Sequence, residues 1–179
     1  MLNGFDIVYT DITITQRGFD YQNLRRLKAG YDAAMATKPD IVFNLIDLRA
    51  FPFCGTISYF VTPAGIDKVR TLVRNELEAG PSLEIDLFYQ REINAGRLRA
   101  ACVFPFLTSV NYDQADRSTI TERKPISAEG LARRMARYSF FVDCDLSVAS
   151  SALAPLTTQR TGDPHLNLLA DIQRILTSP

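Results

Sequence analysis

The stretch from Cys54 to Asp86 limits most tightly how this chain can fold. Thr56 to Val61 is a strand-like run of β-branched and aromatic residues, and Gly55 before it permits a tight or left-handed turn. Thr62-Pro63 predicts a helix start, because a threonine hydroxyl can cap the first amide groups and proline fits the first helical position. Gly80-Pro81 predicts where that helix ends. The stretch therefore encodes a strand followed directly by a helix.

The predicted helix has one apolar face and one charged face, which indicates that it packs on a core. The apolar positions are Ile66, Val69, Leu72, Val73 and Leu77. A second, shorter helix is predicted over Ser82 to Asn94, with Gly96 as its stop. Asp86 falls in its first turn, where the helix dipole favours a negative charge.

The remaining segments predict an α/β domain with a mixed sheet and helices on both faces. The nearly continuous apolar run from Ile41 to Leu48 is typical of a central strand covered on both sides. We expect residues 1–146 to form the domain, 147–163 a loop or linker, and 164–179 a C-terminal helix that packs on the domain. The other expected elements are a strand over 5–15, a helix from Asp20 to about residue 38, a strand over 100–104 and a helix opened by Ser127.

Composition excludes several classes of protein. Lysine plus arginine and aspartate plus glutamate number 20 each, so no overall charge would draw the chain to nucleic acid. No apolar run reaches the roughly 18 residues of a membrane span, and the N-terminus lacks a basic segment followed by an apolar one. We therefore expect a cytoplasmic protein that contacts a membrane only by its surface. The three widely spaced cysteines, Cys54, Cys102 and Cys144, are expected to be reduced and mostly buried.

The run from Gly55 to Val69, GTISYFVTPAGIDKV, followed about twenty residues later by Ile85-Asp86, resembles a motif of glycosyltransferase family 25. That family carries "G-t-a-s-Y-l-i-s-p-x-G-A-x-K-l" and then "p-[IV]-D", and it acts in lipopolysaccharide synthesis and on collagen. Phe104-Pro105 and the segment from Arg117 to Ile120 resemble later parts of the same pattern. The similarity spans roughly residues 5–137.

The resemblance implies a GT-A-like fold that transfers a sugar from a nucleotide sugar to a glycan or lipopolysaccharide acceptor. In such folds a carboxylate at the position of Asp86 serves as catalytic base toward the acceptor hydroxyl or holds the acceptor. Gly55, Thr56, Tyr59 and Ser118 would contact substrate. A turn glycine and a core aromatic are equally good interpretations of Gly55 and Tyr59.

Family members also carry an upstream nucleotide-binding strand and an acidic "E-D-D" that holds the divalent metal, and this sequence has neither. The resemblance therefore implies the C-terminal part of the fold, without the N-terminal nucleotide-binding strands. Asp143 and Asp145 have the D-x-D spacing that lets two carboxylates share Mn²⁺ or Mg²⁺. Asp6 and Asp11, five residues apart in a strand, are weaker candidates, because that separation places them on opposite faces.

The sequence leaves a second class of function open, a non-catalytic binding or assembly module that keeps the fold and has lost the donor site. An edge left by missing strands would favour a homo-oligomer or pairing with an N-terminal partner half. We expect His165 to be a helix-end residue. We expect a solvated basic face from the cluster Arg133, Arg134 and Arg137.

Overall fold

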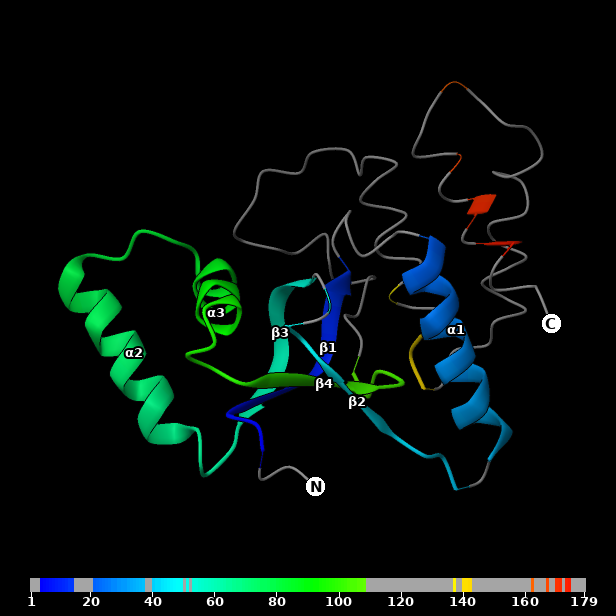
Figure 1. The fold of residues 1–179 in the computed structure, drawn as a ribbon, viewed down its shortest axis with the longest axis horizontal. Coiled ribbons are helices and arrows are strands. Elements are labelled where there is room, and N and C mark those ends of the chain that lie inside the picture. Colours follow the sequence, from blue (N-terminus) through cyan, green and yellow to red (C-terminus); the bar gives the residue numbers. More distant parts are fainter. Residues whose placement is uncertain are drawn as a thin grey trace, which may run out of the picture.

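The computed structural model describes residues 4–14, 21–37, 40–49, 51, 53–108, 137, 140–142, 162, 167, 170–171 and 173–174. Strands and helices alternate along most of this part of the chain (Figure 1). Their order is β1 (Ile7–Ile14), α1 (Tyr21–Ala36), β2 (Asn44–Asp47), β3 (Phe53–Val61), α2 (Ile66–Ala79), α3 (Ile85–Asn94) and β4 (Ala100–Phe104). The described residues of the expected C-terminal helix, between 167 and 174, are helical as well.

The four strands form one open sheet in the order β2-β4-β1-β3. β1 runs parallel to β4 and antiparallel to β3, whereas β2 runs antiparallel to β4. The sheet is therefore mixed, and the predicted α/β class is confirmed. Both central strands are deeply buried: all five residues of β4 are inaccessible or nearly so.

The prediction of a central strand over residues 41–48 is wrong in its placement. The strand is shorter, Asn44–Asp47, and it lies at the edge of the sheet beside β4. Val42 and Phe43, just before it, are 56% and 43% exposed. An apolar run alone does not tell a central strand from an edge strand, because the strand order that decides burial is set by the rest of the chain.

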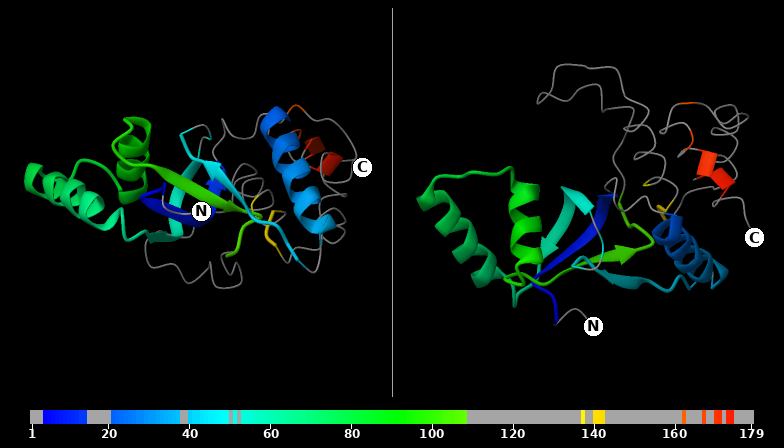
Figure 2. Two further views of the ribbon diagram at one scale, coloured as in Figure 1. Left: turned by 60° about the horizontal axis from the view of Figure 1, so that its bottom comes forward. Right: turned by 45° about the horizontal axis from the view of Figure 1, so that its top comes forward.

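The register places Ile46, Cys102 and Tyr9 on one face of the sheet. On this face α1 packs on Phe104, and α3 packs on Tyr59. Figure 2 shows the two helices at opposite ends of the sheet. The described helices α1 and α3 thus share a face of the sheet, and a helix on the opposite face remains a prediction. Val8 and Ala101, which alternate onto that opposite face, are also completely inaccessible.

Gly55 lies inside β3 and not in a turn before it. Its φ of 86° is in the left-handed region, and the pairing of β3 with β1 shifts register between Asp11 and Thr13, opposite this part of the strand. Gly55 therefore provides the backbone freedom that the sequence suggested. It does so at an irregularity within the strand and not at a turn before it.

The helix start predicted at Thr62-Pro63 is wrong in its position, because Gly65 is the N-cap and Pro63 lies in a turn before the helix, but the Thr62 hydroxyl does accept an amide there. The amide of Gly65 donates to the Thr62 hydroxyl over 3.2 Å and the amide of Ile66 donates to the Thr62 carbonyl over 3.1 Å. Regular α2 then begins at Ile66. Of its predicted apolar face, Val69, Leu72 and Val73 join the core, whereas Ile66 and Leu77 are half or more exposed.

Arg137, expected on a solvated basic face, is instead 4% exposed. Both ends of its guanidinium donate to the carboxylate of Asp11, which is itself inaccessible in β1. Burial raises the pKa of Asp11, while the bond from Arg137 opposes that rise. The pair joins two positions 126 residues apart, so neither residue is available for a metal or a phosphate.

Candidate functional site

The first turn of α3 brings Asp86 against Gly55 of β3. The Gly55 amide donates a hydrogen bond to Oδ2 of Asp86 over 3.3 Å, and the Leu87 amide donates to Oδ1 over 3.0 Å. Asp86 is half-buried. Two residues that the family motif places in one site therefore meet in space, although 31 positions separate them.

Gln90, one helical turn after Asp86, makes a second bond to the same strand. Its side-chain amide donates to the carbonyl of Phe53, two residues before Gly55. We refer to Phe53, Gly55, Asp86 and Gln90 as the α3 contact. In the α3 contact, two side chains of α3 form hydrogen bonds with backbone groups of the edge strand β3. A neighbouring strand would otherwise form such bonds with an edge strand. Gln90 was not among the residues predicted from the sequence, and its i+4 spacing from Asp86 is the signal that points to it.

Three tyrosines lie beside the α3 contact. The rings of Tyr9 and Tyr59 have centroids 5.4 Å apart, and those of Tyr59 and Tyr89 are 5.7 Å apart in an edge-on arrangement. Burial raises the pKa of Tyr89, and hydrogen bonding to Tyr59 raises it further. Tyr59 is therefore partly a core aromatic, as one of its two predicted roles required.

Tyr9 has a fully buried hydroxyl with no hydrogen-bond partner among the residues that the structure describes. Burial raises its pKa, and the nearby Tyr89, Tyr59 and Asp86 add to the effect. An unpartnered buried hydroxyl is costly, so the Tyr9 hydroxyl destabilises the folded state.

A second part of the family motif, from Thr62 to Lys68, binds the start of α2 to Asp6, the residue before β1. The amide of Thr62 donates to the Asp6 carbonyl over 3.0 Å, and Nζ of Lys68 donates to both carboxylate oxygens of Asp6 over 2.8 Å. A Cβ atom on Gly65 would stand 2.2 Å from the Asp6 carbonyl oxygen. We refer to Asp6, Thr62, Gly65 and Lys68 as the α2 anchor.

The α2 anchor also settles the role of Asp6. Oδ2 of Asp6 accepts a third bond, from the amide of Arg99 over 2.8 Å, and the residue is 6% exposed. Asp6 and Asp11 thus have separate structural partners. Within the described residues no group of three histidine, cysteine, aspartate or glutamate side chains is arranged to hold a metal ion.

The other predicted site residues are only partly placed. Thr56 is half-buried in β3 beside Gly55, and no hydrogen bond joins it to Asp86 in the described part of the chain. Ser118, Asp143 and Asp145 lie outside the described residues, as do Cys144 and His165. The thiol of Cys102 is free, as expected, and fully buried, whereas Cys54 is half-buried.

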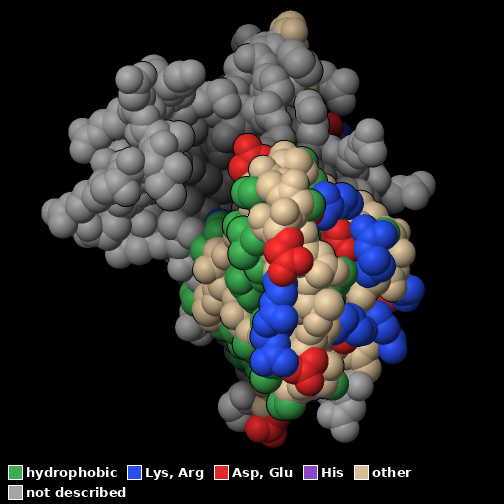
Figure 3. Space-filling view, turned by 90° about the vertical axis from the view of Figure 1, so that its left-hand side faces the viewer, with side chains coloured by type: hydrophobic (Ala, Val, Ile, Leu, Met, Phe, Trp, Pro, Cys, Tyr) green, Lys and Arg blue, Asp and Glu red, His purple; other side chains and the backbone are tan. Residues whose placement is uncertain are grey.

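Among the cavities lined by described residues, two lie close to the helices, and Asp86 lines neither of them. One, of about 200 Å³, is an apolar groove between α2 and α3 that includes Leu77, Ile85 and Phe88. Figure 3 shows this side of the molecule, where hydrophobic side chains run beside the charged outer face of α2. The other, of about 170 Å³, lies between α1 and the β2 edge of the sheet.

The α3 contact has the chemical groups for binding a hydroxyl-rich ligand. A carboxylate has about four lone-pair positions, and the backbone amides of Gly55 and Leu87 use two of those on Asp86. The remaining positions can accept bonds from ligand hydroxyls, and Tyr59 adds an aromatic ring of the kind that stacks on sugars. The site can therefore bind and orient a hydroxyl, and a carboxylate so placed can take its proton.

No protein-family model matches the chain, and neither the curated proteins nor the solved structures contain a match to it. The class that the described part of the chain defines is a mixed α/β domain with an open four-stranded sheet. None of the described helices has the combination of length and apolar character needed to cross a membrane. Membership of glycosyltransferase family 25 stays a prediction from the sequence motif.

Proposed function

We propose that this chain is a glycosyltransferase-like domain that binds a nucleotide sugar and a glycan or lipopolysaccharide acceptor beside the α3 contact. The observation that carries the proposal is the hydrogen bond between Gly55 and Asp86. The family motif predicts that these two residues share a site, and 31 residues of strand, helix and turn fold so that they touch. The proposed fold is GT-A-like.

In this proposal Asp86 orients the acceptor hydroxyl and takes its proton. The hydroxyl oxygen attacks the anomeric carbon of the donor, the bond from that carbon to the diphosphate oxygen breaks, and the diphosphate leaves with the electron pair. The proton passes to the Asp86 carboxylate, which acts as general base. The amide of Gly55 holds the carboxylate in place, which keeps it oriented before the substrate arrives.

Asp143 and Asp145 stay the proposed holders of Mn²⁺ or Mg²⁺. A divalent ion there would neutralise part of the charge on a nucleotide diphosphate. The variants Asp143→Ala and Asp145→Ala should abolish any stabilisation of the protein that depends on Mn²⁺. Stabilisation that persists in both variants would remove these residues from the site.

One observation favours the second candidate, a non-catalytic binding or assembly module. Both oxygens of Asp86 already accept backbone amides, and Gln90 bonds the same strand, so the α3 contact has a complete structural role without any ligand. In that case the domain keeps its fold through Asp86 and works through an exposed surface or sheet edge. A homo-oligomer or an N-terminal partner half would be its partner.

Thermal-shift titration with UDP-sugars and GDP-sugars in the presence of Mn²⁺ separates the two candidates. The transferase proposal predicts a higher melting temperature at millimolar ligand, and loss of that response in Asp86→Asn. Asparagine keeps one oxygen that can accept the Gly55 amide and loses only the bond from the exposed Leu87 amide, so the folded state should keep most of its stability.

Asp67→Asn is the matched control, because Asp67 is also an acid in the first turn of a helix but lies exposed on α2. It should leave the response to ligand unchanged. If no nucleotide sugar changes the melting temperature at millimolar concentration, the transferase proposal is abandoned and the binding module stands. Equal responses of Asp86→Asn and the original protein would remove Asp86 from the proposed chemistry.

A further inference from the structure

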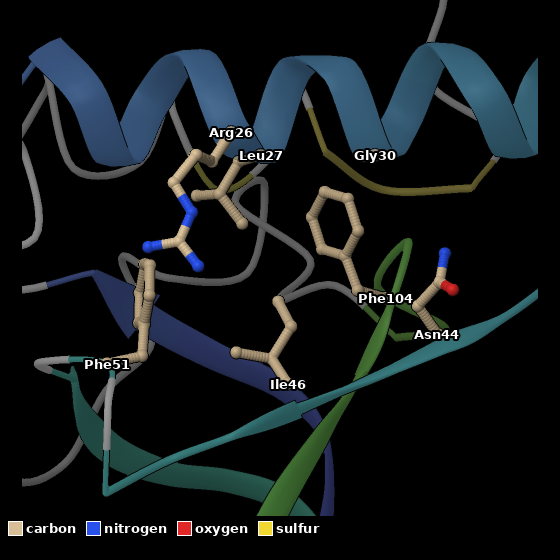
Figure 4. Close-up of a pocket in the computed structure, with 7 residues that line it drawn as sticks. All are labelled: Arg26, Leu27, Gly30, Asn44, Ile46, Phe51 and Phe104. Atoms are coloured by element: carbon tan, nitrogen blue, oxygen red, sulfur yellow. The ribbon is translucent and has the colours of Figure 1, made fainter.

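The cavity between α1 and the sheet has the size and lining of a small-molecule site. Its volume is about 170 Å³. Figure 4 shows the side chains that surround it, with Phe51, Ile46 and Phe104 all below α1. Its lining consists of Arg26, Leu27, Gly30, Asn44, Ile46, Phe51 and Phe104. Five of these seven lack a polar side chain, so the interior is apolar.

Gly30 helps to keep this space open. Gly30 lies on the side of α1 that faces Phe104. A Cβ atom added to Gly30 would lie 3.4 Å from the edge of the Phe104 ring. A larger residue in the middle of α1 would therefore occupy part of the space between helix and sheet. Glycine in a helix interior costs about 1 kcal/mol relative to alanine, and here it leaves room beside the phenylalanine.

The volume fits one aromatic ring. An apolar cavity of about 150 Å³ in another protein stays dry and binds benzene. A cavity of about 170 Å³ therefore holds a benzene-sized body with space for a short substituent. The aromatic rings of Phe51 and Phe104 flank it from two sides, which suits a flat ligand.

The polar residues that line the cavity favour a negatively charged ligand. Arg26 is exposed, and it forms no ion pair with any residue that the structure describes. In Figure 4 its guanidinium hangs from α1 toward Phe51, whereas the carboxamide of Asn44 stands at the opposite end near Phe104. No acidic side chain is among the lining residues. A planar guanidinium forms its strongest pairs with carboxylates, which it can bind through two parallel hydrogen bonds.

We propose that this cavity binds a small aromatic carboxylate, with the ring between Phe51 and Phe104 and the carboxylate on Arg26. The site is distinct from the α3 contact, because it lies on α1 and the β2 edge while Asp86 and Gly55 lie on α3 and β3. It is therefore independent of the proposed transferase function.

Phenylacetate, 2-phenylethanol and phenethylamine are suitable probes, because they carry the same ring with a negative, a neutral and a positive group. Each is titrated into the ¹⁵N-labelled full chain while the backbone amide signals are followed. The proposal predicts that phenylacetate binds most tightly and phenethylamine most weakly. The amides of Gly30 and Asn44 should shift in the same titration. Binding of the amine as tight as that of the carboxylate would overturn the proposal.

Arg26→Gln removes the charge and keeps a side chain of similar helix propensity. It should weaken phenylacetate binding about tenfold, as expected for loss of a charge-assisted pair at an exposed site, and leave 2-phenylethanol binding unchanged. Arg74→Gln is the matched control, because Arg74 is an exposed arginine on α2 away from the cavity. Equal effects of the two substitutions would show a general charge effect and contradict the proposal.

Ile46→Phe tests the cavity itself. Ile46 is half-buried in the cavity wall, and the larger side chain would fill space that the ligand ring needs. Binding of both phenylacetate and 2-phenylethanol should be lost. If either ligand still binds with its original affinity, or if its shifts map to α2 and α3 instead, the cavity is not the site. Should this variant fold poorly, the comparison of Arg26→Gln with Arg74→Gln decides the matter by itself.

Discussion

The α2 anchor and the α3 contact both fasten a helix to the sheet, yet they do so in different ways. In the α2 anchor the start of the helix lies against the backbone of Asp6, so close that a Cβ atom on Gly65 would overlap the carbonyl oxygen. In the α3 contact the side chains of Asp86 and Gln90 reach across to the strand, and Asp86 stays half-buried.

The difference separates two kinds of residue within one sequence motif. Gly65 and Lys68 have a complete structural explanation, because one gives room for a backbone approach and the other pairs with the buried Asp6. Gly55 and Asp86 also have structural roles, but a half-buried carboxylate keeps lone pairs that a ligand can use. Only the second pair is a candidate for chemistry.

The largest expected effect comes from Gly65→Ala in the α2 anchor. The added methyl group would meet rigid backbone at 2.2 Å, so helix or strand must move. We expect the free energy of unfolding to fall by about 3 kcal/mol or more, measured by urea denaturation. Gly80→Ala is the control, since Gly80 has a φ of 87° but open space around it. Because Gly65 has an ordinary φ of −88°, equal losses in the two variants would mean that the close approach costs no more than the backbone strain at Gly80 and would contradict the assigned role of Gly65.

A smaller effect is expected at the far end of α3, where Glu92 is 2% exposed and bonded by Arg91 and Arg97. The bond from Arg97 lowers the pKa of Glu92 below its ordinary 4.5, and the bond from Arg91 adds to this, against the effect of burial. Below about pH 4.5 the unfolded chain takes up a proton that the folded chain does not, so stability falls as the pH falls.

Glu92→Gln should therefore cost about 1–2 kcal/mol at pH 7, and the difference from the original protein should shrink below about pH 4.5. Urea denaturation at a series of pH values measures both quantities. A difference that stays constant down to pH 3 would contradict the assigned pairing. Glu78→Gln, at an exposed position of α2, controls for a general change in net charge.

In the α3 contact, Asp86→Ala and Gln90→Ala should each cost about 1 kcal/mol, because each leaves a backbone group of β3 without its side-chain partner. Asp86→Asn should cost less, since its amide oxygen can still accept the Gly55 amide. Thermal and urea unfolding of the single and double variants measure these costs. If Asp86→Ala leaves stability unchanged, the bond to Gly55 does not hold the carboxylate in place, and the proposed function loses the observation that carries it.

The smallest effect is expected at Tyr9, and its sign differs from the others. Because the hydroxyl has no partner among the described residues, Tyr9→Phe should raise the free energy of unfolding by up to about 1 kcal/mol. Tyr89→Phe, which removes a hydroxyl that bonds Tyr59, should lower it instead. A clear loss of stability in Tyr9→Phe would show that the hydroxyl has a bonding partner after all.

Local signals predicted much of the fold. The bond to the Thr62 hydroxyl, the helix α2 and the short helix bearing Asp86 were all expected from capping, periodicity and glycine stops. These features depend on neighbouring residues, so a sequence window contains their cause. The placement of β2 at the sheet edge was not predicted, because strand order depends on pairings between distant segments.

In the candidate site, too, the sequence predicted individual residues but not the contacts between distant segments. The sequence motif pointed to Gly55 and Asp86, but their hydrogen bond, the bond from Gln90 and the nearby Tyr9 hydroxyl became visible only in the fold. Arg137 gives the clearest case: its helical spacing suggested a solvated cation, and its burial follows from Asp11, 126 residues earlier.

By itself, then, the sequence determined which segments become helices and strands and their approximate positions, since these follow from local backbone preferences and hydrophobic periodicity. The tertiary structure alone decided which strand is central, which charges are buried together and which carboxylate remains accessible. Burial and pairing are properties of groups brought together across the whole chain, and they set the energy of a charge far more than its neighbours in sequence do.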